Sequence, residues 1–324
     1  MIRPETENRQ ADPPAAPAVR VAYIAGTGRS GSTLLSRLLG QMDGCVSVGE
    51  LRYLWERGTI DDAPCACGMS FSRCGFWTAV LARTFGSGEL PDPRSLLALQ
   101  RRVDRHRNIP LFVRPELCPA GLGRDIRAFR RLTAALYRSV AEVSGARVVV
   151  DSSKVPPVAF LMRDAPSVDL RVIHIVRDPR AVAHSWQRRK ARLDGSDGRR
   201  FMPVFSPGRA AGRWVLTNAE MEAYKLLFPG RVLRVRYEDL ARRPRPWLER
   251  IARFALGHDA DPDFLQGNVA HLSPEHSFSG NPMRARVGPV VIRPDEEWRN
   301  RGAGMPRVLS LALGPMLLGY GYRP

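Results

Sequence analysis

The sequence predicts an α/β protein built on a P-loop-type parallel β-sheet that is flanked by helices and carries a helical insertion. Two observations predict this fold class. A glycine-rich turn joins an apolar strand pattern to a helical pattern within residues 19–39. Four further apolar runs, separated mostly by helical patterns, follow at residues 46–48, 147–150, 170–176 and 232–235. Strands that alternate with helices form parallel sheets with right-handed crossovers, so we expect a ligand cleft along the carboxyl edge.

The first strand leads into a loop that is typical of phosphate binding. Gly26 and Gly31 fit the frame G-x-x-x-x-G, and a helix is predicted from about Thr33 to Gln41. Such a turn points backbone N–H groups and the helix dipole at an anion. Ser32 stands where a nucleoside-triphosphate loop has its lysine, and the nearest cation is Arg29. The loop therefore predicts a phosphate ligand other than ATP.

The insertion is predicted to be helical. Residues 76–85, 93–106 and 124–143 have helical patterns, and the last of these repeats apolar side chains at near-helical spacing, at Ile126, Phe129, Leu132, Leu136 and Val140. The next strand, at residues 147–150, is followed by Asp151-Ser152-Ser153-Lys154 and by two prolines that favour a helix start. Lys154 is therefore expected near a strand end.

A second anion site is predicted after the strand at residues 170–176. Arg177 ends this strand, Asp178 and Pro179 suit the first positions of a helix, and Ser185 falls about two turns further on. Open α/β sheets place ligands at this edge. An arginine guanidinium and a hydroxyl can share one phosphate there.

The length and composition fit one domain. The chain has 324 residues, of which 44% are hydrophobic, and this is enough to bury a full core. We expect residues 1–18, which are rich in proline, alanine and polar side chains, to be a disordered tail. Residues 19–324 would form the domain, with the insertion around residues 58–145. No apolar stretch reaches membrane-spanning length, so we expect a cytoplasmic protein.

Together, the two phosphate motifs resemble those of sulfotransferases that use 3′-phosphoadenosine 5′-phosphosulfate (PAPS). The R-S-G-S-T form of the loop looks like that of the carbohydrate and tyrosyl branches, and the resemblance runs from about Val19 to about Arg299. It implies a sulfotransferase with PAPS as donor. Its 5′-phosphosulfate would be bound by Arg29, Ser30, Gly31, Ser32 and Thr33, and its 3′-phosphate by Arg177 and Ser185. The acceptor would be a hydroxyl or amine of a carbohydrate, lipid, tyrosine or small molecule.

The resemblance also implies catalytic residues. Gly49-Glu50 ends the predicted strand at residues 46–48 and resembles the G-E element that carries the glutamate of tyrosyl sulfotransferases. Glu50 would accept the acceptor proton, while Arg29 and Lys154 would neutralise charge on the leaving phosphate. An ordinary helix-start glutamate is the alternative for Glu50. No catalytic magnesium is expected, because a sulfuryl group carries less charge than a phosphoryl group.

The C-terminal loop at residues 277–284 resembles a G-N-P-M-R segment of bacterial sulfotransferase-like chains. Arg284 in this loop is a candidate for the 3′-phosphate site, and an ordinary loop arginine is the alternative. We expect His271 and His276 to be surface residues rather than bases.

Three of the five cysteines, Cys65, Cys67 and Cys74, lie in one short loop. A structural zinc site normally needs four ligands, and the nearest downstream histidine is His106. We therefore favour a reduced loop or a redox-sensitive bridge, and we expect no metal.

Two other functions stay open at this point. A kinase-like P-loop enzyme would be expected to carry the loop lysine and an acidic magnesium ligand at a strand end. The net charge of +18, from 50 basic and 32 acidic side chains, would attract nucleic acid, an anionic membrane surface or a multiply charged nucleotide. The chain shows no zinc-finger spacing or aromatic-basic RNA motif, so we expect no nucleic-acid partner, whereas peripheral membrane contact stays open.

Overall fold

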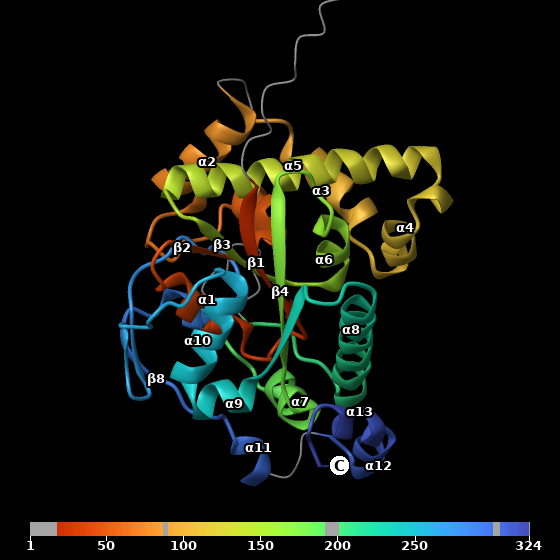
Figure 1. Cartoon of the computed structure of the whole chain (residues 1–324), viewed down its shortest axis with the longest axis vertical. Helices are drawn as coiled ribbons and strands as arrows, with labels where there is room; N and C mark the ends of the chain where they lie inside the picture. Colours follow the sequence, from red (N-terminus) through yellow and green to blue (C-terminus); the bar gives the residue numbers. More distant parts are fainter. Residues whose placement is uncertain (1–17, 87–89, 192–200, 301–304, 324) are drawn as a thin grey trace, which may run out of the picture.

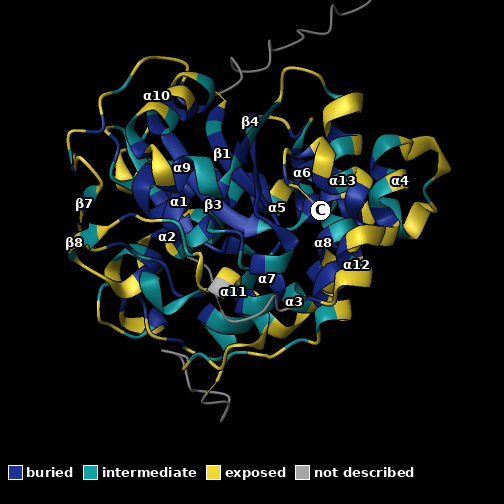
Figure 2. Cartoon of the chain, turned by 90° about the horizontal axis from the view of Figure 1, so that it is seen from below, coloured by how far each residue is buried: buried dark blue, intermediate teal, exposed yellow. Residues whose placement is uncertain are grey.

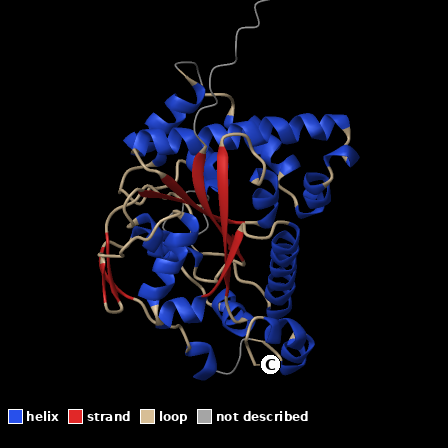
Figure 3. Ribbon diagram, in the orientation of Figure 1, coloured by secondary structure: helices blue, strands red, loops and turns tan. Residues whose placement is uncertain are grey.

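A computed structural model describes residues 18–86, 90–191, 201–300 and 305–323 of the chain. Its centre is a sheet of five strands in the order β2-β3-β1-β4-β5, and every neighbouring pair is parallel (Figures 1 and 3). The predicted α/β class is therefore confirmed. The tail expected at residues 1–18 lies outside the described residues except for Ala18.

The strands and helices have the following bounds. The strands are β1 (Val19–Gly26), β2 (Cys45–Gly49), β3 (Val148–Lys154), β4 (Val168–Val176), β5 (Val232–Arg236), β6 (Leu265–Gln266), β7 (Val269–Leu272) and β8 (Gly288–Val291). The helices are α1 (Ser32–Gly40), α2 (Gly75–Phe85), α3 (Pro93–Val103), α4 (Ile109–Val113), α5 (Ala120–Ser144), α6 (Pro156–Met162), α7 (Pro179–Gln187), α8 (Pro207–Leu227), α9 (Tyr237–Arg242), α10 (Pro244–Ala255), α11 (Glu297–Asn300), α12 (Arg307–Ala312) and α13 (Gly314–Gly319).

Both faces of the central sheet are buried, because successive side chains of a strand point to opposite faces. On β1, Val21 and Tyr23 join the core under α5 and α6, whereas Ala22 and Ile24 join the core under α1 and α10. The central strands are accordingly the darkest part of Figure 2, whereas residues 114–117, which follow the outlying α4, are exposed. This explains why these strands read as continuous apolar runs.

The helix after β4 begins as predicted. Asp178 precedes α7, and its carboxylate accepts the backbone N–H of Arg180 at 2.9 Å, while Pro179 is the first helical residue. Both roles are favoured at a helix start. The cap fixes the turn that follows Arg177 at the end of β4.

The segment between β2 and β3 holds α2, α3, α4 and α5. Figure 1 shows α2, α3 and α5 grouped at the top of the view, and α5 is the longest helix of the described residues. Its side chains Ile126, Phe129, Leu136 and Val140 are buried, as the apolar spacing predicts. The boundaries of the domain and of its insertion stay predictions.

A second, smaller sheet lies beyond the first and has no counterpart in the sequence analysis. β6, β7 and β8 pair antiparallel in that order, and Leu265, Ala270 and Leu272 pack into the core beside α1. Near the C-terminus, α12 and α13 are separated at Leu313, and Gly314 and Pro315 are the first residues of α13. Among the described residues, no helix is long and apolar enough to cross a membrane.

Candidate active site

The predicted phosphate loop connects β1 to α1 at the carboxyl edge of the sheet. Gly31 has a φ of 90°, and a Cβ atom there would lie 2.3 Å from the ring of Tyr237. A Cβ atom on Gly26 would lie 2.3 Å from the carbonyl oxygen of Ile175. Both glycines of the frame are thus required by the close approach of neighbouring chain segments. Arg29, between them, also has a positive φ, of 73°.

Several polar atoms in and beside the loop are buried with no hydrogen-bond partner among the described residues. They are Oγ1 of Thr27, Oγ of Ser30, Nε of Arg29 and Nε of Arg177. Buried polar groups are normally satisfied, so a cluster of unsatisfied donors marks a place for a polar ligand. The donors here are cationic or neutral, and this favours an anion.

Arg177 is buried, with 5% of its surface exposed, and it joins three segments. Its Nη1 donates to the carbonyl oxygen of Arg29 at 3.1 Å, its Nη2 lies 3.1 Å from the carboxylate of Asp295, and its guanidinium stacks on Tyr237 at 4.5 Å. Although burial raises the pKa of Asp295, Arg177 holds it below its ordinary value. Ser185 is also buried, on α7.

Arg29 lies over an aromatic surface that the sequence analysis missed. Its guanidinium is 4.8 Å from the centre of the Trp186 ring, which in turn stacks on Phe205. Burial lowers the pKa of Arg29, and the negative charge of Glu50 opposes this shift. Trp186 directly follows Ser185 in the sequence. The predicted 3′-phosphate motif, which ends at Ser185, was therefore the available signal for this contact. Arg29 therefore lies against Trp186 of α7 and close enough to Glu50 to feel its charge.

Glu50 and Lys154 form an ion pair across the ends of β2 and β3. Oε1 of Glu50 lies 2.5 Å from Nζ of Lys154, and only 8% of the surface of Glu50 is exposed. Glu50 precedes a short 3₁₀ helix, η1 (Leu51–Tyr53), but its side chain caps no backbone N–H there. The side chain of an ordinary helix-start glutamate would bond to that helix end. The structure instead directs this carboxylate to the lysine.

The backbone at Lys154 is unusual for a non-glycine residue, with a φ of 73°. Such conformations cost free energy and persist only where the surroundings enforce them. Here Asp151 supplies one restraint, because its carboxylate accepts the backbone N–H of Ser153 at 2.8 Å and the hydroxyl of Tyr137 at 2.7 Å. The end of β3, which carries Lys154, is thereby anchored to α5.

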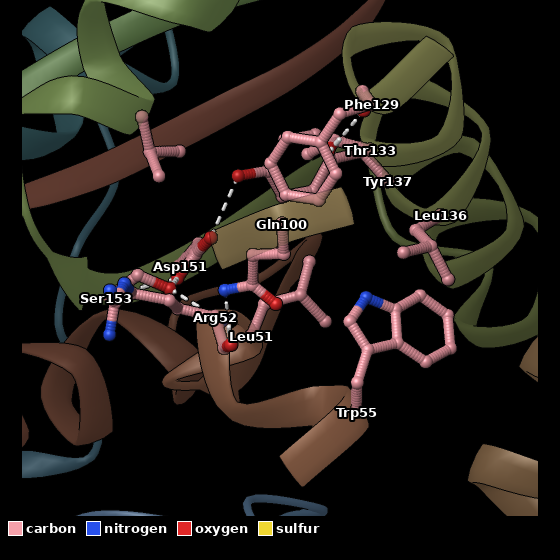
Figure 4. A pocket seen from close by; sticks show the side chains of 11 residues that line it. Leu51, Arg52, Trp55, Gln100, Phe129, Thr133, Leu136, Tyr137, Asp151 and Ser153 are labelled. Carbon is pink, nitrogen blue, oxygen red and sulfur yellow. Dashed lines mark hydrogen bonds between the residues drawn. The ribbon is translucent and has the colours of Figure 1, made fainter. Parts of the chain in front are cut away.

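Figure 4 shows a cavity between the end of β3 and α5. Its volume is about 30 Å³, close to the share of one water molecule in the liquid. Inside it, the side chain of Gln100 donates to the carbonyl oxygen of Arg52 at 2.8 Å, and Ser153 accepts the backbone N–H of Arg52 at 2.9 Å. Small-molecule sites are roughly ten times larger. The cavity is therefore too small for an acceptor. Its hydrogen bonds instead connect the segments that follow Glu50 and precede Lys154.

The C-terminal loop covers Glu50. We call residues 276–281 the covering segment. A Cβ atom on Gly280 would lie 2.7 Å from Oε1 of Glu50, and one on Gly49 would lie 2.7 Å from Cβ of Ser277. Arg284 is buried, and its Nη1 donates to the carbonyl oxygen of Ser277 at 2.7 Å. The hydrogen bond to Ser277 places Arg284 beside the covering segment, on the same side as Glu50. Arg177 is instead contacted by Asp295.

The clustered cysteines lie beside the covering segment. Cys65, Cys67 and Cys74 meet His276, which is half-buried rather than on the surface as expected from the sequence. His106, the histidine that the sequence analysis considered, instead lies 2.8 Å from Glu220. The histidine beside the cysteines was missed because it lies in a distant part of the chain, and no local spacing points to it.

The chain is similar to known sulfotransferases. A family model described as the sulfotransferase family matches residues 22–261, which is more than half of the chain. The sulfotransferase domain from the olefin synthase of Synechococcus PCC 7002 is similar in structure, with a TM-score of 0.54 and 23% identity over 98% of this chain and 100% of that one. The sulfotransferase domain from the curacin biosynthetic pathway gives a TM-score of 0.52 and 18% identity over 96% and 100%. No curated protein matches the sequence significantly.

Proposed function

The chain belongs to the sulfotransferase family, and we propose that it transfers a sulfuryl group from PAPS to a hydroxyl or amine of an acceptor. One observation carries this proposal. In the phosphate loop, Ser32 stands in place of the ATP-binding lysine, and the carbonyl oxygen of Arg29 lies 3.1 Å from Nη1 of Arg177, a buried arginine at the end of the neighbouring strand β4. A donor with phosphate groups at both its 5′ and 3′ positions would use both features.

The donor would be bound by the groups that the described residues leave unsatisfied. Thr27 and Ser30 hydroxyls and the N–H groups at the start of α1 would hold the 5′-phosphosulfate. The guanidinium of Arg177, with Ser185 on α7, would hold the 3′-phosphate. The Trp186 ring packs against the guanidinium of Arg29 and would hold it beside the donor. In this arrangement Arg29 neutralises charge on the 5′-phosphate.

Glu50 would act as the general base. Its ion pair with Lys154 holds the side chain in place at the sheet edge, and a carboxylate can accept a proton from the acceptor group. The acceptor oxygen or nitrogen gives its proton to Glu50 and forms a bond to sulfur. The bond between sulfur and the bridging oxygen breaks, and its electron pair stays on the 5′-phosphate. Arg29 and Lys154 stabilise that charge, and 3′,5′-ADP is released.

A kinase-like reaction is the weaker alternative. It would need a lysine in the loop and a carboxylate that holds magnesium. Ser32 occupies the lysine position, and the carboxylate at the end of β2, Glu50, is already paired with Lys154. Two cations, Arg29 and Lys154, therefore supply the positive charge that the metal supplies in kinases.

Binding calorimetry tests the proposal. Wild-type protein should bind 3′,5′-ADP without a divalent metal and should bind ATP with magnesium much more weakly. Protein that binds 3′,5′-ADP would then be given ³⁵S-labelled PAPS and a panel of carbohydrate, lipid, tyrosine-peptide and small-molecule acceptors. Binding of magnesium-ATP with no response to 3′,5′-ADP would reject the proposal in favour of a kinase-like enzyme.

A further inference from the structure

Four side chains with metal-binding atoms converge at one point next to the covering segment. The Sγ atoms of Cys65, Cys67 and Cys74 and a ring nitrogen of His276 all lie within 4.8 Å of one another. Cys67 and Cys74 have their Sγ atoms 3.6 Å apart. Nδ1 of His276 lies 3.3 Å from Sγ of Cys74 and 3.9 Å from Sγ of Cys65. The group is thus arranged around a common centre.

These distances are those of a tetrahedral zinc site. Zinc bonds of about 2.3 Å to sulfur and about 2.0 Å to nitrogen place two sulfur ligands about 3.8 Å apart, and sulfur and nitrogen about 3.5 Å apart. Three of the six distances among the four ligand atoms, at 3.6, 3.3 and 3.9 Å, lie within a few tenths of an ångström of these values, and none of the six exceeds 4.8 Å. Three thiolates and one imidazole also form a closed structural set, with no position left for substrate.

The ligands are held in place by local structure. Cys65 and Cys67 lie in a tight turn, in which the N–H of Gly68 donates to the carbonyl oxygen of Cys65 at 3.0 Å. The N–H of Cys65 donates to the carbonyl oxygen of Met69 at 2.8 Å. These backbone hydrogen bonds fix the turn, and they thereby keep the two cysteines close to each other.

The histidine is oriented independently of the turn. Its ring stacks on Phe76, with the ring centres 4.5 Å apart and the planes 11° apart. Its carbonyl oxygen accepts the indole N–H of Trp77 at 2.5 Å. Both aromatic residues belong to α2, which begins immediately after Cys74. The ring position of His276 is therefore set by packing, as the preorganisation of a ligand requires.

The cluster joins two distant parts of the chain at the candidate base. Besides the four side chains, the N–H of Ala66 donates to the carbonyl oxygen of Ser277 at 2.8 Å. Ser277 lies against Gly49, and Gly280 lies against Glu50. A bond between His276 and the cysteine cluster would therefore fix the position of the covering segment over the Glu50 carboxylate.

We propose that Cys65, Cys67, Cys74 and His276 bind one structural zinc ion, which fastens the covering segment over Glu50. The site is separate from sulfuryl transfer, and it stands whether or not the proposed reaction is correct. A disulfide between Cys67 and Cys74 is the competing arrangement, because their sulfur atoms are close. That bridge would leave Cys65 and His276 without a role, whereas zinc uses all four ligands.

The first test is the metal content of the whole chain, purified under reducing conditions without chelator. Mass spectrometry of the metals should find one zinc per chain. Replacement of that zinc by cobalt should produce the strong visible bands of a tetrahedral thiolate site. Zinc far below one per chain, a different metal, or a Cys67–Cys74 disulfide in the peptide map would overturn the proposal.

The second test assigns the ligands. Cys74→Ser and His276→Ala should each lower zinc content, whereas the matched controls Cys118→Ser and His106→Ala should keep it at the wild-type level. Full zinc retention in both ligand variants would overturn the assignment. A ligand variant that fails to fold is replaced by wild-type protein treated with a thiol reagent. Zinc release should then coincide with modification of Cys65, Cys67 and Cys74, and release without their modification would contradict the site.

Discussion

The two halves of the candidate site are assembled in different ways. The donor half consists of the phosphate loop at residues 26–33 with Arg177 and Ser185, and it comes from two units of strand, turn and helix. The base half consists of Glu50, Lys154 and the covering segment, which lie in three separate parts of the chain. A site built from local turns can be predicted from short motifs. A site built by long-range packing depends on contacts that the sequence does not display.

The largest expected effect lies in the base half. Glu50→Gln keeps the shape of the side chain but removes the proton acceptor, so kcat should fall by about 10²–10⁴-fold. Affinity for 3′,5′-ADP should stay close to wild type, because the donor half is unchanged. Steady-state turnover and calorimetry on the same preparation measure the two quantities.

Glu142→Gln is the matched control for that prediction, since Glu142 is an exposed partner of Arg83. It should leave both quantities unchanged. Near wild-type turnover in Glu50→Gln would remove Glu50 from the chemistry and return it to the role of an ordinary residue at a strand end.

The donor half should respond in affinity. Arg177→Ala removes a buried guanidinium whose charged hydrogen bonds are each worth about 1.5–3 kcal/mol, so the Kd for 3′,5′-ADP should rise by about 10–150-fold. Arg253→Ala, which removes an exposed arginine paired with Asp259, should change nothing. Equal affinities in the two variants would show that the 3′-phosphate is bound elsewhere.

The covering segment connects packing to the base. A Cβ atom on Gly280 would lie 2.7 Å from the Glu50 carboxylate, and its φ of 116° disfavours other residues. Gly280→Ala should displace Glu50 and lower kcat by about tenfold or more, with little change in donor affinity.

Gly267→Ala provides the comparison for that variant. Gly267 also has a positive φ, of 57°, but open space surrounds its Cβ position. The two variants therefore share backbone strain and differ in the contact with Glu50. Equal kcat values would mean that the covering segment has no influence on the base.

The smallest expected effect is a gain. Asp295 pairs with Arg177 and would compete with a 3′-phosphate for the guanidinium. Because Asp295 is partly exposed, solvent screens its charge, and Asp295→Asn should lower the Kd for 3′,5′-ADP by only about 1.5–5-fold. The gain should shrink as salt is added. A weaker Kd in Asp295→Asn would show that Asp295 supports donor binding rather than opposing it.

Prediction from sequence succeeded where the signal is local. The parallel sheet, the glycine-containing turn between β1 and α1 and the Asp178 cap follow from apolar runs, glycine spacing and one residue suited to a helix start. The sequence placed Glu50 and Lys154 each at the end of a strand, and therefore at the same edge of the sheet. It did not predict that the two side chains form an ion pair.

The remaining features arise from tertiary contacts. The small sheet of β6, β7 and β8 consists of very short strands, and its pairing depends on packing against α1. His276 joins the cysteines because the chain returns to the end of β2 after β5, the last strand of the central sheet in sequence. Asp295 reaches Arg177 for the same reason. No window of adjacent residues contains these partners, so no periodicity or spacing predicts them.

We propose that the donor half recognises a phosphate at the 3′ position, and one calorimetric comparison tests this recognition directly. Wild-type protein and Arg177→Ala are titrated with 3′,5′-ADP and with 5′-ADP, which lacks the 3′-phosphate. Wild type should bind 3′,5′-ADP far more tightly than 5′-ADP, and the substitution should abolish most of that preference. Equal affinity of wild-type protein for the two nucleotides would contradict the account.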